Sequence, residues 1–326
     1  MVQLILIGIG AGAATALLFA SIASGSVFSV LLFYLAPLPI LIAALGWSHW
    51  AALIAAIAAA TGLAFVFGAF FFIAFMVGIG LPAWWLGYLA LLARPVTNGG
   101  GTPESLEWYP VGFLVVWAAI VGALVVSAAI LNFGIDEESF RASLRNGLER
   151  MLRLQTRAGA PGRVPGITDS KRLLDFLVLA LPPAAAVLAT ITNVLNLWLA
   201  SRIVRVSGTL RRPAPDLPSM QFPAYAPVLV AGAVAGSFLS GLVGVAAGVL
   251  TASMLMAYAI LGFAVLHSIT RGMDSRLFVL GGIYAAVVVF GWPVLVMTLL
   301  GLADTAFDIR GRVARKRGPP PPAPRT

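Results

Sequence analysis

The sequence lacks cysteine and carries little charge, and each scarcity excludes a kind of chemistry. Without cysteine the chain has no disulfide, no thiolate metal site and no thiol nucleophile. His49 and His267 are the only histidines, and two histidines do not build a typical zinc site. Charged residues make up 10% of the 326 positions, against roughly 25% in a soluble domain. We therefore expect no metal and no cofactor.

Motifs for nucleotide and proton chemistry are missing as well. Lys171 and Lys316 are the only lysines, and neither follows a glycine-rich loop, so the chain contains no P-loop. The apolar runs carry no Asp or Glu at their centres, which excludes an acidic proton relay. The sequence thus predicts no catalytic residue and no ATPase in this chain, and we expect a protein that is not an enzyme.

What the sequence has in abundance is apolar length, with 60% of its residues hydrophobic. Nearly all the apolar runs reach the roughly 17–25 residues that cross a bilayer. The pattern predicts an all-α fold, a polytopic membrane helix bundle with about eight or nine transmembrane segments and one amphipathic cytoplasmic helix. The expected organisation is an N-terminal membrane bundle over residues 1–132, a cytoplasmic Arg-rich amphipathic helix and linker over 133–172, a C-terminal membrane bundle over 173–305, and a basic, Pro-rich disordered tail over 306–326.

Prolines and glycines mark where the apolar runs are interrupted. Pro37 and Pro39 predict a kink or an unwound segment, and Gly68 is the natural break in the long run that follows. Pro182 and Pro183 predict a break inside the most polar span of the chain. Toward the C-terminus, the expected spans are 224–250, 251–269, and a last one over 277–302 with a break at residues 291–293.

One hydrophilic stretch, from Ile135 to Arg163, separates the spans. Asp136 fits an N-cap, with acidic residues in the first turn and arginines toward the end, as the helix dipole favours. An apolar stripe runs along one face: Phe140, Leu144, Leu148, Met151 and Leu152. The basic residues on the other faces are Arg141, Arg145, Arg150, Arg153 and Arg157. We predict that this helix lies on the membrane surface, with a partner protein as the alternative.

The net charge of +9 resides in loops and at the C-terminal end. Anionic lipid headgroups are therefore the expected partners of these charges, and nucleic acid is not. The stretch 133–172 carries eight basic residues and the chain from Ala303 carries six. An even number of spans separates the two, so we expect both on the cytoplasmic side of a bacterial inner membrane, with the C-terminus cytoplasmic.

A row of small residues follows one face of the first span: Gly8, Gly12, Ala16 and Ala20. Such a row lets another helix approach closely. Packing within the chain is one interpretation, and docking of a separate membrane subunit is the other.

A polar face occupies the second half of the span that starts at Leu173. Thr190, Asn193 and Asn196 lie three residues apart and project from one side of a helix. An amide in hydrocarbon without a partner is costly, so this face should point at protein or at a cavity. The three residues are candidates for binding a small molecule, and hydrogen bonds between helices are the alternative.

Several of these motifs together resemble a known family. They are Leu-Ala-Pro-Leu-Pro at 35–39, Asn193 and Asn196 followed by Arg202, Gly-Leu-Ala-Asp at 301–304 and Phe-Asp-Ile-Arg at 307–310. In these the chain resembles the YybS-like family of predicted bacterial membrane proteins of unknown function. That family distantly resembles the substrate-binding S components of energy-coupling-factor transporters. The resemblance implies a ligand site and a small-residue docking face on the first helix, where Gly8, Gly12, Ala16 and Ala20 fit.

Two functions follow from these observations. The first is a small-molecule-binding subunit of a transport system, without its own ATPase. The second is a non-transporting membrane scaffold or assembly protein that recruits partners through its basic segments. A cavity lined by the asparagines and aromatic residues would favour the first function, and a solid interior would favour the second.

Overall fold

The computed structural model describes residues 1–96, 105–157, 170–213 and 217–317. Seven of its helices are long and apolar enough to cross a membrane, and three apolar helices in the same described ranges are shorter. The all-α membrane bundle predicted from the sequence is therefore confirmed. The difference from the expected eight or nine segments arises in the C-terminal third, where the shorter helices lie.

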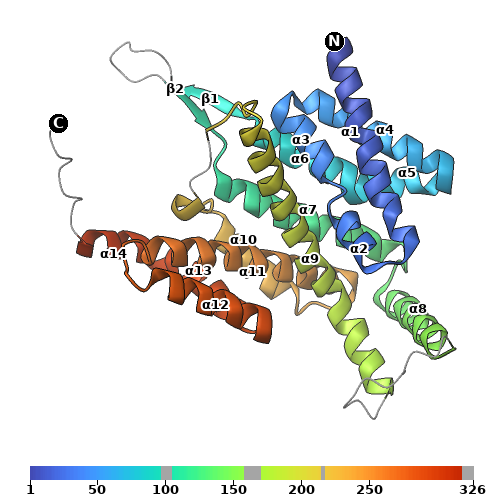
Figure 1. Cartoon of the computed structure of the whole chain (residues 1–326). Coiled ribbons are helices and arrows are strands. Elements are labelled where there is room, and N and C mark those ends of the chain that lie inside the picture. Colours follow the sequence, from blue (N-terminus) through green and yellow to red (C-terminus); the bar gives the residue numbers. More distant parts are fainter. Residues whose placement is uncertain (97–104, 158–169, 214–216, 318–326) are drawn as a thin grey trace.

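The first third of the chain forms helices joined by tight turns (Figure 1). In order they are α1 (Val2–Ala20), η1 (Ser21–Ser24), α2 (Val27–Tyr34), α3 (Leu38–Gly46), α4 (His49–Phe67), α5 (Phe70–Phe75), η2 (Met76–Gly80) and α6 (Leu81–Ala90). Two short antiparallel strands follow, β1 (Ala93–Val96) and β2 (Ser105–Trp108), with Ala93 opposite Trp108. They carry the chain from the end of α6 to the start of α7.

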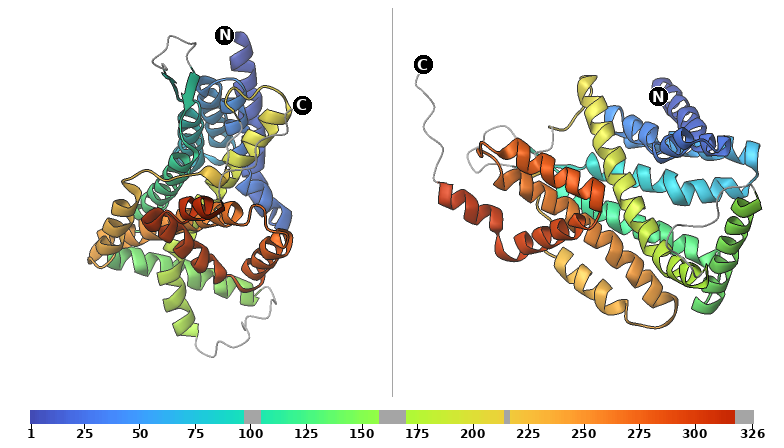
Figure 2. Two further views of the ribbon diagram at one scale, coloured as in Figure 1. Left: turned by 90° about the vertical axis from the view of Figure 1, so that its left-hand side faces the viewer. Right: turned by 60° about the horizontal axis from the view of Figure 1, so that its bottom comes forward.

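The remainder of the chain is helical from α7 onward. Its elements are α7 (Val111–Leu131), α8 (Glu137–Arg157), α9 (Ser170–Val206), η3 (Leu217–Ser219), α10 (Ala226–Gly236), α11 (Gly241–Ile269), α12 (Arg276–Phe290), α13 (Pro293–Phe307) and α14 (Ile309–Arg317). Figures 1 and 2 show α9 lying between the N-terminal helices and the C-terminal ones. The parts expected to form two membrane bundles are therefore in contact, because α9 packs on α3 and α7 as well as on α11.

The predicted breaks hold at some positions and fail at others. Pro37 separates α2 from α3, and Gly68 ends α4 with a φ of 102°, a conformation that favours glycine. By contrast, α9 continues through Pro182 and Pro183 as one helix of 37 residues. Each proline removes one helical hydrogen bond, and Val178 and Ala186 on either side of the pair are buried against neighbouring helices, which supports the helix there.

The expected boundary between the spans 224–250 and 251–269 is wrong. The chain turns at residues 237–240, and α11 then runs without interruption from Gly241 to Ile269. Gly241 adopts a φ of 80°, which favours a turn, whereas the Thr251 hydroxyl donates to the Ala247 carbonyl inside the helix. A threonine hydroxyl that donates to a carbonyl of its own helix is compatible with a continuous helix. The glycine-rich run before Thr251 therefore does not end the helix.

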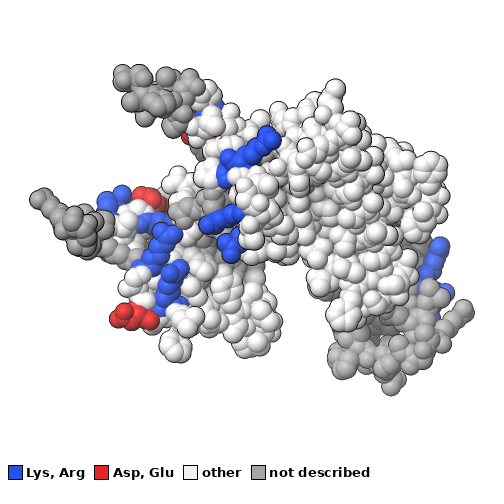
Figure 3. Space-filling view, turned by 45° about the horizontal axis from the view of Figure 1, so that its top comes forward, with Lys and Arg blue, Asp and Glu red and all other residues white. Residues whose placement is uncertain are grey.

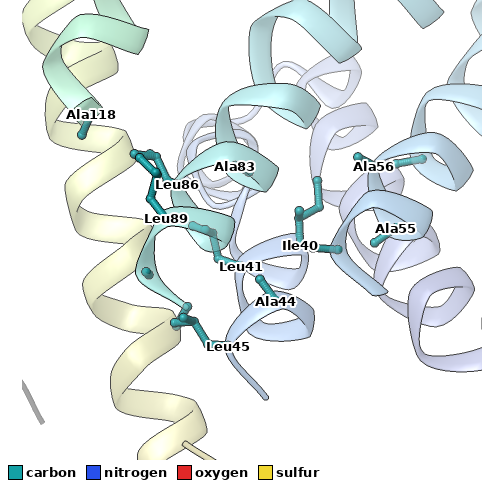
Figure 4. Packing of buried hydrophobic residues seen from close by; sticks show 14 of the residues in the cluster. Ile40, Leu41, Ala44, Leu45, Ala55, Ala56, Ala83, Leu86, Leu89 and Ala118 are labelled. Atoms are coloured by element: carbon teal, nitrogen blue, oxygen red, sulfur yellow. The ribbon is translucent and has the colours of Figure 1, made fainter. Parts of the chain in front are cut away.

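The largest core cluster lies among α3, α4, α6, α7 and α9 (Figure 4). Ile40 lies beside Ala55 and Ala56, whose small side chains let α4 approach closely, and Leu86 lies near Leu89 on α6. A second cluster joins α7, α10 and α11 around Tyr258. Because lipid is as apolar as these side chains, close packing and not apolarity drives this association.

The chain after residue 306 is not a disordered tail over its whole length, since Ile309–Arg317 form α14. A buried ion pair anchors that helix: Arg310 Nη2 lies 2.7 Å from Asp304 Oδ2, and Arg310 Nη1 donates to the carbonyls of Pro218 and Met220, both at 2.8 Å. Residues 318–326 lie outside the described part of the chain. The motifs at 301–304 and 307–310 therefore form a clasp on the segment before α10.

The two basic segments lie at opposite ends of the molecule (Figures 1 and 2). Phe140 of α8 packs with Ile130 near the end of α7. Arg310 of α14 instead holds Met220, whose neighbour Gln221 touches Gly112 at the start of α7. Because α7 is long enough to span the membrane, this arrangement contradicts the expectation that α8 and the tail share one side.

Candidate functional site

A cavity of about 470 Å³ lies between α7, α9 and α11, and Arg212, Leu217, Pro218 and Met220 from between α9 and α10 complete its wall. Its volume falls within the roughly 300–1,000 Å³ typical of small-molecule sites. Most of the wall is apolar, with Val115, Val194, Leu195, Met220, Met256 and Ile260 as representatives. Such a wall suits a ligand that is apolar over most of its length.

Four polar side chains interrupt this wall: Ser201, Arg212, His267 and Tyr284. His267 Nε2 lies 2.9 Å from the Tyr284 hydroxyl, so these two satisfy each other and join α11 to α12. Among the described residues of the wall there is no Asp or Glu. The charge that the cavity presents is therefore the positive charge of Arg212.

Arg212 is 9% exposed and reaches from the connecting segment to the ends of two other elements. Its Nη1 donates to the carbonyl of Ala90 at 3.1 Å, at the end of α6, and its Nη2 donates to the carbonyl of Tyr109 at 3.3 Å. The Nε–H is shielded from solvent and has no partner in the described part of the chain. Burial lowers the pKa of the Arg212 guanidinium, because the charged form loses hydration. A buried cation with an unused donor thus belongs to the cavity wall.

The opening of the cavity lies between α9 and α12. Ile191, Leu195 and Trp198 of α9 and Tyr284 of α12 belong to the wall and are also exposed. The guanidinium of Arg202 lies 5.7 Å from the Trp198 ring, and such Trp and Arg side chains are typical of a membrane–water interface. The broad surface seen in Figure 3 is largely free of charge away from the basic clusters. The mouth therefore faces the bilayer near one interface.

The asparagine face lies elsewhere on α9, and none of its three residues lines this cavity. Thr190 Oγ1 donates to the Ala186 carbonyl of its own helix at 2.9 Å. Asn193 Nδ2 donates to the Ala118 carbonyl of α7 at 3.3 Å. The neighbouring residues Ile191 and Val194 reach the cavity from a different face of the same helix. The structure thus brings Thr190, Asn193 and Asn196 together as contacts to helices.

Asn196 donates a hydrogen bond to a carbonyl of α2 that the break between α2 and α3 leaves without its helical donor. Its Nδ2 donates to the Tyr34 carbonyl at the end of α2 and to the Thr192 carbonyl, both at 2.8 Å. Pro37 has no N–H, and the Leu38 amide donates to Leu35 and not to Tyr34. The side chain is fully buried, and its Oδ1 has no partner in the described part of the chain. Asn196 therefore caps α2 from 162 residues away.

The small-residue row on α1 packs on α4 of the same chain. A Cβ on Gly8 would lie 2.6 Å from Ile54 Cγ2, and one on Gly12 would lie 2.6 Å from the Ala55 carbonyl oxygen. Ala16 and Ala20 are partly buried against the largest core cluster. Packing within the chain thus occupies the face that was a candidate for docking a separate subunit.

The arginines of α8 are mostly engaged within the chain. Arg141 pairs with Glu137, Arg145 with Asp175, and Arg153 with Glu149. Arg150 is exposed, and the side chain of Arg157 lies outside what the structure describes.

The predicted cap on α8 is confirmed, because Asp136 Oδ1 accepts from the Ser139 amide at 2.8 Å, a bond that lowers the pKa of Asp136. Phe140 and Leu144 of the apolar stripe pack against this chain's own helices, so those two side chains are covered by the protein itself.

Sequence reasoning missed the cavity and Arg212. Arg211 and Arg212 stand together in a connecting segment, where positive charge is ordinary at the end of a span. Arg211 is exposed and Arg212 is buried, and no local pattern distinguishes them. The one hint is that the proline after Arg212 forces an extended chain there, which lets a side chain turn inward.

The comparisons with known proteins agree with the fold. No curated protein and no solved structure matches the chain. The likeness to the S components of energy-coupling-factor transporters thus stays an expectation. A family profile described as a predicted membrane protein (DUF2232) matches residues 13–305, most of the chain and all of the spans that form the cavity. The chain belongs to this DUF2232 family of predicted membrane proteins.

Proposed function

We propose that this membrane protein binds a largely apolar small molecule in the cavity between α7, α9 and α11. In this role it is a subunit of a transport system whose energy comes from another chain, since no P-loop is present in the sequence. The cavity itself is the observation that carries the proposal. A recess of about 470 Å³ that opens toward the bilayer has the size of a small-molecule site.

The wall and the mouth support a ligand that comes from the membrane. The wall is apolar and the exposed wall residues Ile191, Leu195 and Trp198 face the bilayer. A molecule dissolved in lipid reaches such a mouth without crossing water. The loss of apolar contact with lipid is then offset by contact with the wall.

The experiment is to fill the cavity and weigh what the protein carries. Ile260 belongs to the wall, so an Ile260→Trp variant places an indole where the ligand would lie. Val288 on α12 is 85% exposed, so Val288→Trp adds the same side chain on the outside. We expect native mass spectrometry of protein in lipid nanodiscs to detect a bound small molecule in the parent and in Val288→Trp but not in Ile260→Trp. Absence from the parent, or equal occupancy in all three, contradicts the proposal.

We also propose a bacterial inner-membrane location with the C-terminus in the cytoplasm. The stretch 133–172 holds eight of the 21 basic residues, and the other 13 lie elsewhere in the chain. Arg202, Arg211 and Arg310 belong to the end of the molecule where α14 clasps the segment before α10. The positive-inside rule then favours that end for the cytoplasm and leaves α8 on the opposite side.

The scaffold function remains the second candidate, and α14 is the observation that favours it. Arg312, Arg315 and Lys316 are exposed on that helix. Replacing all three by Glu leaves Asp304 and Arg310 in place and reverses the exposed charge. If cellular function depends on this reversal and not on Ile260→Trp, the scaffold function is the better description.

A further inference from the structure

We propose that the cavity takes an amphiphile with an anionic head, a carboxylate or a phosphate monoester, held by Arg212, and with an alkyl chain lying along α9. This rests on the proposed function, because it names the chemical class of the molecule in the same cavity. The head would lie beside the Arg212 guanidinium and compensate its charge. The alkyl chain would lie against the apolar wall of the cavity.

Arg212 supplies the argument for the anionic head. The carbonyls of Ala90 and Tyr109 take one donor from each terminal nitrogen, and they bring no negative charge. The Nε–H is buried away from the cavity and has no partner among the residues that the structure describes, so the charge of the guanidinium is what the cavity meets. A guanidinium presents its donors in a fixed plane that matches carboxylate and phosphate oxygens. An anion in the cavity would compensate this buried positive charge, for which the described wall residues offer no carboxylate.

The apolar wall of the cavity supplies the argument for the alkyl chain of the ligand. Along α9 the wall extends from Ile191 to Ser201, which is about 15 Å of helix. Facing α9, the cavity wall is lined by apolar side chains such as Val115 of α7 and Met256 of α11. The interface pair of Trp198 and Arg202 lies on the same half of α9 as Ser201. A bilayer amphiphile keeps its head at the interface and its chain inward, and the cavity has the same polarity.

A purely structural role for Arg212 explains less. Its two terminal nitrogens fasten the connecting segment to the end of α6, which a cap alone would do. That role leaves the buried positive charge without a carboxylate among the described wall residues, and the cavity beside it without an occupant.

The test uses the full chain in phosphatidylcholine nanodiscs and a dodecanoic acid that carries a photoreactive diazirine near the end of its chain. After irradiation, peptide mass spectrometry locates the label. We expect it on the peptides that contain Val115 or Met256. Competition is measured with four unlabelled compounds at equal concentration: dodecanoate, dodecyl phosphate, dodecanol and inorganic phosphate.

Dodecanoate and dodecyl phosphate should displace the label, whereas dodecanol and inorganic phosphate should not. Arg212→Gln should raise the concentration of dodecanoate needed for displacement about tenfold or more, as expected for a lost charge-assisted bond. Arg211→Gln, with an exposed side chain one residue away, should leave it unchanged. Arg212→Lys serves as a second variant if Arg212→Gln does not fold, because it keeps the charge without the planar fork, and weaker displacement is again expected.

The contradicting outcomes separate the two proposals. If dodecanol competes as well as dodecanoate, or if both Arg212 variants bind like the parent, the anionic head is wrong while the apolar site survives. If inorganic phosphate alone competes, the site takes a free anion and the amphiphile is wrong. If the label is absent from both cavity peptides, this inference and the proposed function both fail.

Discussion

Replacing Asn196 by Leu should destabilise the protein more than the same change at Asn193. The Asn196 amide donates at 2.8 Å to the Tyr34 carbonyl, which Pro37 and Leu38 leave without a donor. Removing it strands a partly buried carbonyl, which costs up to about 3 kcal/mol. Loss of the unpartnered Oδ1 offsets part of that cost. Asn193 makes one longer bond, of 3.3 Å, to a carbonyl inside α7, and its loss should cost about 0.6 kcal/mol.

The assay is unfolding of the purified variants in one detergent, followed by circular dichroism on heating or on titration with a denaturing detergent. We expect Asn196→Leu to melt about 2–4 °C below the parent and Asn193→Leu to stay within about 2 °C of it. Neither side chain lines the cavity, so the bound small molecule should be the same in both. An equal or larger loss in Asn193→Leu would refute the capping argument. Loss of ligand from Asn196→Leu at unchanged stability would restore the binding hypothesis for that residue.

Three further predictions concern two charged side chains and the membrane topology. Asp304→Asn breaks the buried pair with Arg310 and should cost about 3–5 kcal/mol, whereas Asp308→Asn, in a pair more than half exposed, should cost less than about 1 kcal/mol; equal melting temperatures would count against the clasp. Hydrogen bonds from Ser139 lower the folded-state pKa of Asp136, so its contribution is complete above the ordinary value of 3.8 and is lost as pH falls through the lower folded value; Asp136→Asn should abolish that acid-side loss of α8 helicity. Cysteine at Ser143 in α8 and at Ala314 in α14 should react with an impermeant maleimide from opposite sides of the membrane, and labelling from one side would refute the topology.

Local signals explain what could be predicted from the sequence. Gly68, Pro37 and the cap at Asp136 act through backbone geometry or through neighbours in the chain, so each is visible in a short window. The charge and apolar length of whole segments likewise predicted the membrane bundle. By contrast, Pro182 and Pro183 were misread, because tertiary packing supports a helix that local rules would break.

The candidate site depended on contacts that no window contains. Asn196 meets Tyr34 across 162 residues, so its role as a cap became visible only when α2 and α9 were placed side by side. Arg212 and its neighbour Arg211 have the same local charge, and only the fold buries one of them. A cavity is a property of several helices together, and periodicity on one helix does not reveal it.

A density map of the protein in lipid nanodiscs, at a resolution that shows side chains, tests the central claim most directly. We predict elongated density along α9 from Ser201 toward Ile191, with its head beside the Arg212 guanidinium. The same map of Ile260→Trp should show the indole in place of that density. A cavity that is empty, or collapsed by movement of the segment that carries Met220, would contradict the account.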